Sequence, residues 1–370
     1  MKNKQLRSSI SAYTHRAMSP FPYRYVLMNA IATHLLRAAH LLTLAAGISV
    51  FFCLPGVADD FYRGKSIQLM IGYGPGGGYD VYGRLLARHI GRHIPGNPHI
   101  IAHNMPGAAS LVALRHLDAI APKDGTVATL FDFVQIVNSV VDPQKSGMNL
   151  RNYNWIGSIS EDLSVCYVWA TRGISSLEQL RQRPQVHMGL TAAGDSQDIR
   201  LKILRRLLGV NVKPVAGYPG TGTQYVALER GELDAGCGGW SSLPLSWRTE
   251  GKINVLVRFV PNQPPGFPPN VPYAGDLVAS ERERSVLRLL SDPAQLGKPV
   301  IMSQAVPADR VQMIRNAFSA TLKDPQFLAD AERLKVEISP KLASESEQIL
   351  DEIHAMPSDI INAARKLIMD

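Results

Sequence analysis

The stretch IGYGPGGGYD, residues 71–80, holds five glycines among its ten residues. It follows the apolar run 66–71 and precedes the run 81–94, in which apolar residues recur at helical spacing. Glycine tolerates backbone conformations that other residues avoid and lets another group approach the main chain closely. The stretch therefore predicts a strand, a loop that a ligand can approach, and a helix.

One interpretation of this loop is a nucleotide site. Gly72, Gly74 and Gly77 satisfy G-x-G-x-x-G, the fingerprint of dinucleotide-binding folds. That fingerprint also needs an acidic residue about 20 residues further on, at the end of a second strand, to bind a ribose hydroxyl. The next strand-like run, 99–103, ends instead in Asn104, and no G-K-[ST] follows the glycines. A Rossmann-like NAD-dependent oxidoreductase remains the alternative function.

The order strand, small-residue loop, helix occurs four times. The first unit is the one above, and the others have strands at 99–104, 186–190 and 211–216, loops at 105–107, 191–196 and 218–222, and helices at 108–120, from 197 to Gly209, and 223–230. Strands that alternate with helices predict mainly parallel sheets. Ligands of such sheets bind beyond the carboxyl ends of the strands, where these loops lie.

The four loops indicate an anionic ligand. Each helix start offers unpaired N–H groups and the positive end of a dipole. The loops contain no Lys or Arg, so we expect peptide dipoles and hydroxyl groups, not full charges, to hold the anion. A carboxylate fits this description. Roughly five or six hydrogen bonds of about 1.5–3 kcal/mol each, less the cost of association, suffice for micromolar binding, so no catalytic group is needed.

The N-terminal 58 residues are predicted to be an extension and a signal peptide. They contain six basic residues and no acidic one, and they supply most of the net charge of +8. Arg37, the apolar run 41–54 and the small residues at 56–58 fit an export signal that is cleaved after Ala58, which predicts a periplasmic protein. The rest of the chain has 33 basic against 31 acidic residues, so no basic patch indicates nucleic acid.

Other candidate sites have weaker support. Cys166 and Cys237 could form a bridge in an oxidising compartment, but two buried, unbridged side chains are the favoured interpretation. His89 and His93 have the spacing of zinc ligands on a helix, but they lie on an Arg-rich face that we expect to be solvated, so no metal site is predicted. The serines lack the G-x-S-x-G motif of hydrolases, and no catalytic residue is predicted.

Several motifs together resemble one family. The P-G-G-x-x-D-x-x-x-R pattern of residues 75–84 is similar to the signature of the extracytoplasmic solute receptors of tripartite tricarboxylate transporters, the Bug family. Five further matches follow in family order, and the resemblance spans about residues 61–357. They are Asn104-Met105-Pro106-Gly107-Ala108, Lys123-Asp124-Gly125-Thr126, Trp155-Ile156-Gly157, Tyr218 with Gly220, and Gly231-Glu232-Leu233-Asp234.

The resemblance implies an α/β periplasmic binding protein with two lobes, of the type II-like Venus-flytrap kind, each lobe with a mixed, mainly parallel sheet. Lobe 1 would comprise 59–162 and about 258–370, and lobe 2 about 163–257. Such receptors hold a small organic acid between the lobes and deliver it to the membrane permease subunits of the transporter. We expect a monomer without cofactor or enzymatic activity. A periplasmic sensor without a transport role is a further alternative.

The expected ligand contacts combine the loops with the family motifs. They are Tyr73, Gly74, Pro75, Gly76, Gly77, Gly78, Tyr79, Asp80, Asn104, Pro106, Gly107, Ala108, Thr191, Gly194, Asp195, Ser196, Tyr218, Gly220, Thr221 and Gly238. Two departures from the family bear on the ligand: Gly194–Asp198 replaces G-S-x-x-H, and Gly238 stands where an acidic residue is frequent. Asp195 either caps the helix that follows it, which is the favoured interpretation, or faces the ligand, where it would disfavour a second carboxylate.

Overall fold

The computed structural model describes residues 61–261, 263 and 266–369. They belong to one compact unit, Ala58–Asp370. The predicted export signal and its cleavage site after Ala58 lie outside the described residues. Within those residues, none of the helices combines the length and the apolar character needed to cross a membrane.

The first sheet has six strands in the order β11-β4-β10-β3-β1-β2. Their bounds are β1 (Ser66–Ile71), β2 (His99–Asn104), β3 (Val127–Leu130), β4 (Asn154–Ser158), β10 (Pro299–Met302) and β11 (Lys341–Leu342). Strand β1 pairs in parallel with β2 and β3, whereas β10 runs antiparallel to β3 and β4. Every residue of β3 and β10 is buried, as expected of apolar strands inside a sheet that is covered on both faces.

The second sheet has five strands in the order β7-β6-β8-β5-β9. Their bounds are β5 (Ser164–Trp169), β6 (Val186–Gly189), β7 (Val212–Val215), β8 (Ala235–Gly239) and β9 (Ile253–Arg258). Strand β6 is parallel to β7 and β8, and β5 is antiparallel to β8 and β9. Parallel pairing in both sheets is thus confined to the repeated units and to β3 and β8. Both sheets are mixed, and the expectation that they are mainly parallel was wrong, because β10 and β11 in the first sheet and β5 and β9 in the second pair antiparallel.

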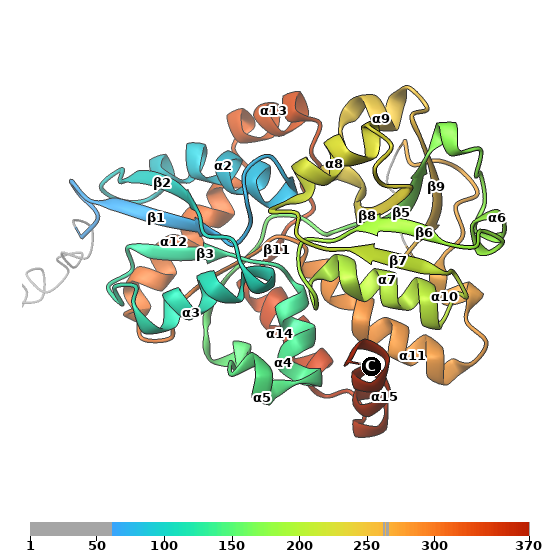
Figure 1. Ribbon diagram of the computed structural model, residues 1–370. Helices are drawn as coiled ribbons and strands as arrows, with labels where there is room; N and C mark the ends of the chain where they lie inside the picture. Colours follow the sequence, from blue (N-terminus) through green and yellow to red (C-terminus); the bar gives the residue numbers. More distant parts are fainter. Residues whose placement is uncertain (1–60, 262, 264–265, 370) are drawn as a thin grey trace, which may run out of the picture. The chain divides into compact units, whose positions relative to one another are not determined.

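All four predicted strand–loop–helix units are present. Their helices are α2 (Gly78–Ile90), α3 (Leu111–Ala119), which follows the short 3-10 helix η3 (Ala108–Ser110), α7 (Ser196–Arg206) and α8 (Thr221–Glu229). Figure 1 shows α7 and α8 on opposite faces of the second sheet. Helix α2 begins three residues earlier than its apolar pattern predicts, because Gly77 is extended and serves as its N-cap.

The other helices complete the covering layers. They are α4 (Val134–Val141), α5 (Pro143–Ser146), α6 (Leu177–Arg181), α9 (Leu245–Thr249), α10 (Ala274–Leu277), α11 (Glu281–Ser291), α12 (Ala308–Thr321), α13 (Pro325–Leu334), α14 (Ala343–His354) and α15 (Ser358–Met369). After β9 the chain supplies β10 and β11 to the first sheet. Its last helix, α15, contacts α4, α11 and α7, so the C-terminal segment also reaches the helix layer of the second sheet.

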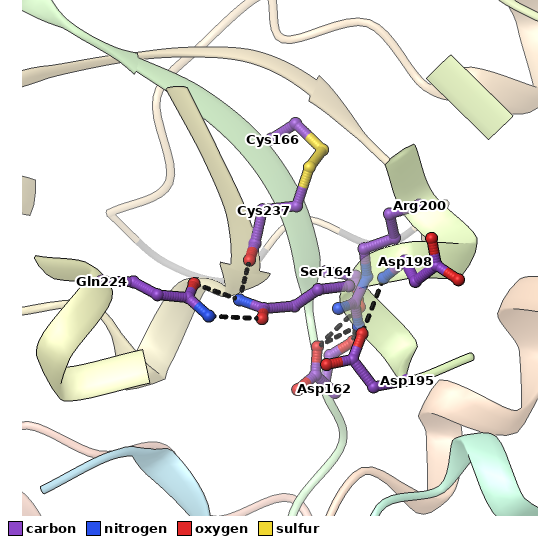
Figure 2. Close-up of a disulfide and its surroundings, with 9 residues drawn as sticks. Asp162, Ser164, Cys166, Asp195, Asp198, Arg200, Gln224 and Cys237 are labelled. Carbon is purple, nitrogen blue, oxygen red and sulfur yellow. Dashed lines mark hydrogen bonds and ion pairs between the residues drawn. A yellow bond between two sulfur atoms is a disulfide. The ribbon is translucent and has the colours of Figure 1, made fainter. Parts of the chain in front are cut away.

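A disulfide joins Cys166 in β5 to Cys237 in β8 (Figure 2). The prediction of two unbridged thiols was therefore wrong. The two residues are 71 apart in sequence, but antiparallel pairing of β5 with β8 sets them directly opposite each other, with Cα atoms 4.1 Å apart. Residues that face each other on adjacent antiparallel strands are close enough for their sulfur atoms to be bonded. Whether the two cysteines can bond depends on strand register, which sequence spacing does not reveal.

Candidate ligand-binding site

A cavity of about 40 Å³ lies where the glycine loop after β1 meets the ends of the second sheet. Eight of the predicted residues line it: Tyr73, Gly74, Gly77, Gly78, Tyr79, Ser196, Thr221 and Gly238. Seven lining residues were not predicted: Asp162, Gln197, Arg200, Tyr225, Gly239, Ser242 and Lys298. The structure thus brings together residues from the loops after β1, β6, β7 and β8, as the topology of α/β sheets leads one to expect.

The glycines of the first loop permit a close approach to the second sheet. A Cβ atom on Gly74 would lie 2.7 Å from the carbonyl oxygen of Pro219. A Cβ atom on Gly77 or Gly78 would lie closer than 3.0 Å to the hydroxyl oxygen of Thr221 or Ser242, respectively. These glycines are therefore needed for contact between the two parts of the fold, which is a different reason from the ligand approach that the sequence suggested.

Asp80 and Asn104 fix the conformation of the glycine loop by hydrogen bonds. The Asp80 carboxylate accepts hydrogen bonds from Gly76 N at 3.0 Å, Arg84 Nε at 2.8 Å and Asn104 Nδ2 at 2.9 Å. Asn104 also donates to the carbonyl oxygen of Tyr73 at 2.8 Å. Asp80 and Arg84, four residues apart on α2, form an ion pair. Neither Asp80 nor Asn104 lines the cavity, so both act on a ligand only through the shape of the loop.

The buried carboxylate of Asp132, which was not predicted from the sequence, joins the glycine loop to the start of α7. The Asp132 side chain is fully buried and accepts from the hydroxyl groups of Tyr73 at 2.6 Å, Tyr79 at 3.1 Å and Ser196 at 2.9 Å. The rings of Tyr73 and Tyr79 are stacked with centroids 4.8 Å apart. Burial and the Asp132 charge raise the pKa of both tyrosines well above the usual value. Their hydroxyl groups therefore remain protonated donors to Asp132.

Full charges line the cavity, contrary to the expectation that peptide dipoles and hydroxyl groups alone would hold an anion. Asp162 Oδ2 lies 3.1 Å from Lys298 Nζ, and Asp162 Oδ1 lies 3.1 Å from Arg200 Nη2. All three side chains are buried. Burial alone would raise the pKa of Asp162, but the two cations, together with the hydrogen bond from Ser164, outweigh burial and hold it below its usual value. These residues lie outside the glycine-rich loops, in segments that no motif marks.

A pair of amides fixes the side of the cavity nearest the disulfide. Gln197 and Gln224 exchange two hydrogen bonds of 2.9 Å, and Gln197 Nε2 also donates to the carbonyl oxygen of Cys237 at 3.0 Å. Figure 2 shows Gln224, the disulfide, and the cluster of Asp162, Ser164 and Arg200 on neighbouring elements. Strand β8, which the disulfide ties to β5, carries Gly238 and Gly239 of the cavity lining directly after Cys237.

Asp195 is the N-cap of α7, and this confirms the favoured of its two interpretations. Its Oδ1 accepts from Asp198 N at 2.7 Å, and its Oδ2 accepts from Thr191 N at 3.2 Å and Ala192 N at 3.0 Å. The side chain is fully buried and does not line the cavity. Burial raises the pKa of Asp195 to about 7, although the backbone hydrogen bonds act in the opposite direction. Asp195 therefore stabilises the loop before α7 and does not border the cavity.

The remaining predicted contacts do not line this cavity. They are Pro75, Gly76, Pro106, Gly107, Ala108, Thr191, Gly194, Tyr218 and Gly220. Ala108 and Gly194 line a separate cavity of about 310 Å³ between η3, α4, α7 and α15. The loop 105–110 instead supports the glycine loop by a hydrogen bond, because Ser110 Oγ donates to the carbonyl oxygen of Gly72 at 3.2 Å. Thr191 Oγ1 donates to Gln197 Oε1 at 3.3 Å, which orients an amide of the cavity.

His89 and His93 each pair with a different acidic residue. His89 lies 2.9 Å from Asp330, and His93 lies 2.7 Å from Asp324. The expectation that both lie on a solvated face was wrong for His89, which is 5% exposed because the helix α13 covers it. Within the described ranges, no three His, Cys, Asp or Glu side chains are grouped as metal ligands.

Comparisons place this architecture among known folds. No protein-family model and no curated protein matches the sequence. Among solved structures, the periplasmic binding protein BugD is 16% identical with a TM-score of 0.66, covering 83% of this chain and 98% of its own. MatC from Rhodopseudomonas palustris with bound malate is 18% identical with a TM-score of 0.64, covering 80% and 99%. R. palustris Rpa4515 with adipate is 16% identical with a TM-score of 0.65, covering 82% and 98%.

These likenesses define the class of fold. The described chain has the two-lobed α/β fold of periplasmic binding proteins, as predicted. A TctC solute-binding protein from Polaromonas is also similar in fold, with 17% identity and a TM-score of 0.55, covering 83% of this chain and 99% of its own.

Proposed function

We propose that this protein is an extracytoplasmic solute receptor that binds a small organic carboxylate between two lobes and delivers it to a transporter of the tripartite tricarboxylate type. The observation that carries the proposal is the cavity bounded by the glycine loop, the first residues of α7 and α8, and two buried cations. Helix N-termini and fixed cations both favour a negative ligand. The fold and the sequence motifs support the same assignment.

We take lobe 1 to be 59–162 with about 258–370, and lobe 2 to be about 163–257. The first sheet draws its strands from 66–158 and 299–342, and the second from 164–258, which supports this division. The glycine loop of lobe 1 would close against Pro219, Thr221 and Ser242 of lobe 2. A cavity of about 40 Å³ holds only a few water molecules, so an acid of several carbons enters when the lobes move apart.

The ligand class follows from the lining and from the structural neighbours. MatC carries malate and Rpa4515 carries adipate in the solved structures, and both are carboxylates. In this chain the groups that we propose to contact the ligand are Gly77 and Gly78 of lobe 1 and Ser196, Thr221 and Gly238 of lobe 2. No step of bond making or breaking is proposed, because the receptor releases its ligand unaltered.

We further propose that the protein is periplasmic and exported by a signal peptide that is cleaved after Ala58. The basic Arg37, the apolar run 41–54 and the small residues at 56–58 support this proposal. Two alternatives make different predictions. A Rossmann-like oxidoreductase would bind NADH, whereas a periplasmic sensor would bind the same acid but associate with a signalling protein in place of a permease.

A thermal-unfolding screen of carboxylates tests the proposal. The panel includes lactate, succinate, malate and adipate, with NADH as the competing ligand. A ligand at about a hundred times its Kd stabilises the folded state by about 2.7 kcal/mol. We expect at least one acid to stabilise the protein, to bind stoichiometrically in calorimetry and to be recovered unchanged. Stabilisation by NADH alone would overturn the receptor assignment.

A further inference from the structure

Lys298 lies next to the glycine loop, with its Cε 3.9 Å from the position that a Cβ atom on Gly78 would take. It directly precedes β10, and its backbone N–H donates to Ser158 Oγ at 3.1 Å. The Lys298 residue lines the cavity but is only 2% exposed. The ammonium group lies 4.8 Å from the ring centroid of Tyr79 and 5.4 Å from that of Tyr82. Aromatic faces at this distance hold a cation without supplying a negative charge. Lys298 is therefore a buried, positioned cation at the edge of the cavity.

More cationic than anionic side chains line the cavity. Lys298 and Arg200 are both cationic, and they share the single carboxylate of Asp162. Both Asp162 oxygens are occupied, since Oδ1 also accepts from Ser164 Oγ at 2.6 Å. Lys298 Nζ makes one hydrogen bond within the described part of the chain, to Asp162, and an ammonium group can donate three. A buried cation with spare donors that faces a cavity favours an anionic partner there.

Two other buried carboxylates lie nearby, and the lining does not include them. Asp132 lies behind the stacked tyrosines and accepts from Tyr73, Tyr79 and Ser196. Asp195 accepts from the backbone at the start of α7. The charged side chains that line the cavity are therefore those of Lys298, Asp162 and Arg200.

We propose that Lys298 is the specificity-determining residue that recognises the ligand's charge, with one ligand carboxylate oxygen as the second hydrogen-bond acceptor of its ammonium group. This inference rests on the proposed function and narrows it, because the site then selects a carboxylate over the isosteric neutral amide. Asp162 and Arg200 are positioning residues: Asp162 fixes the ammonium group, and Arg200 from α7 fixes Asp162. Hydroxyl groups of Ser242 and Thr221 border the same space and suit a polar substituent of the acid.

The experiment compares acids with their amides. The pairs are lactate and lactamide, succinate and succinamide, malate and malamide, and adipate and adipamide, measured by calorimetry with the wild-type protein. We expect the best-bound acid to bind at least tenfold more tightly than its amide. Equal affinity of the wild-type protein for acid and amide overturns the inference, whether or not any variant folds.

The variant Lys298→Met then assigns the selectivity to this side chain. We expect its affinity for the acid to fall at least tenfold and its affinity for the amide to change less than threefold, with most of the selectivity retained in Lys298→Arg. Lys298→Gln substitutes if the Met variant does not fold. Lys202→Met is the matched control, because Lys202 also pairs with a buried Asp but lies outside this cavity, and it should leave both affinities unchanged.

The outcomes separate the two proposals. A proportional loss of acid and amide binding in Lys298→Met and Lys298→Gln, or no loss at all, shows that Lys298 is only structural and overturns this inference while the receptor function stands. Failure of every acid in the panel to bind the wild-type protein removes the proposed function and this inference together.

Discussion

A Cβ atom on Gly77, the N-cap of α2, would lie closer than 3.0 Å to the hydroxyl oxygen of Thr221, the first residue of α8, although the two helices follow strands of different sheets. The backbone of Gly77 is extended, with φ −94°, so any residue could adopt it without local strain. Glycine is required here only because Thr221 is near. Contact between the two lobes, not loop geometry, therefore determines the residue at this position.

The first prediction is that Gly77→Ala weakens ligand binding with little loss of fold stability. The added methyl group keeps the glycine loop away from α8, so the lobes cannot close fully around the ligand. We expect at least a tenfold loss of affinity for the acid that stabilises the wild-type protein most, measured by calorimetry. Thermal unfolding of the unliganded variant should change by less than about 1 kcal/mol, because without ligand the lobes can move apart and relieve the contact with Thr221.

A second substitution makes this prediction specific. Apart from the Thr221 hydroxyl oxygen, the nearest atoms to the added Cβ are Thr221 Cβ and N, both at 3.7 Å, which is an ordinary contact. Thr221→Ala should therefore restore part of the affinity that Gly77→Ala loses, and Thr221→Ala alone provides the control for a direct ligand contact. Strictly additive losses in the double variant would show that the two residues do not meet when the ligand is bound.

The sequence was most informative where structure is local. The four strand–loop–helix units followed from apolar spacing and from small residues at the helix starts, and their strand bounds agree closely with the structure. Residues of the first loop, which the sequence marked as ligand contacts, line the cavity. Its role was only half understood, because Gly74, Gly77 and Gly78 face Pro219, Thr221 and Ser242, which are more than 140 residues away in the sequence.

The charged part of the site could not be predicted from spacing. Asp162 and Lys298 are 136 residues apart, and Asp162 and Arg200 are 38 apart. Each taken alone resembles an ordinary surface charge, and only the return of the chain to β10 brings Lys298 beside Asp162. The disulfide was missed for the same reason, since the pairing of β5 with β8 is a tertiary property.

The second prediction concerns that disulfide. Cys166 and Cys237 enclose a long segment, so their bond restricts the unfolded chain, and its removal should cost about 2–4 kcal/mol of unfolding free energy. Urea unfolding of Cys166→Ala/Cys237→Ala measures this loss. Reductant should lower the wild-type midpoint to that of the double variant and leave the double variant unaffected. An unchanged wild-type midpoint, with both thiols shown to be free, would contradict a structural role for the bond.

The third prediction concerns export. Protein recovered from the periplasm should begin at Asp59, because the small residues at 56–58 suit signal peptidase. N-terminal sequencing provides the measurement. Ala58→Phe, which places a bulky residue at the cleavage position, should accumulate as a longer form, whereas a conservative change at the same position, Ala58→Gly, should still be processed. A periplasmic wild-type protein that starts at Met1 or Met28 would show that no cleavage occurs.

The last prediction concerns Asp195, whose two oxygens accept three backbone N–H groups. Asn caps helices about as well as Asp, but Asp195→Asn replaces one acceptor oxygen by an NH₂ donor. A protonated Asp195 carboxyl keeps acceptor capacity on both oxygens, whereas the Asn NH₂ can only donate and would face N–H groups of either the cap or the loop, so we expect a loss of about 1–3 kcal/mol at pH 5. The ligand preference should not change, because Asp195 does not line the cavity.

The pH dependence of this loss distinguishes the mechanism. Burial raises the native pKa of Asp195 to about 7, against about 3.9 for an unfolded Asp. Between these values the native state binds more protons than the unfolded state, so the Asp195 contribution to wild-type stability declines as the pH rises through 7. Asn cannot titrate, and the deficit of Asp195→Asn should therefore shrink between pH 5 and pH 8. Urea unfolding of both proteins at these pH values measures it, with Asp359→Asn, at an exposed position of α15, as the control. A deficit that stays constant would show that Asp195 is already ionised at pH 5.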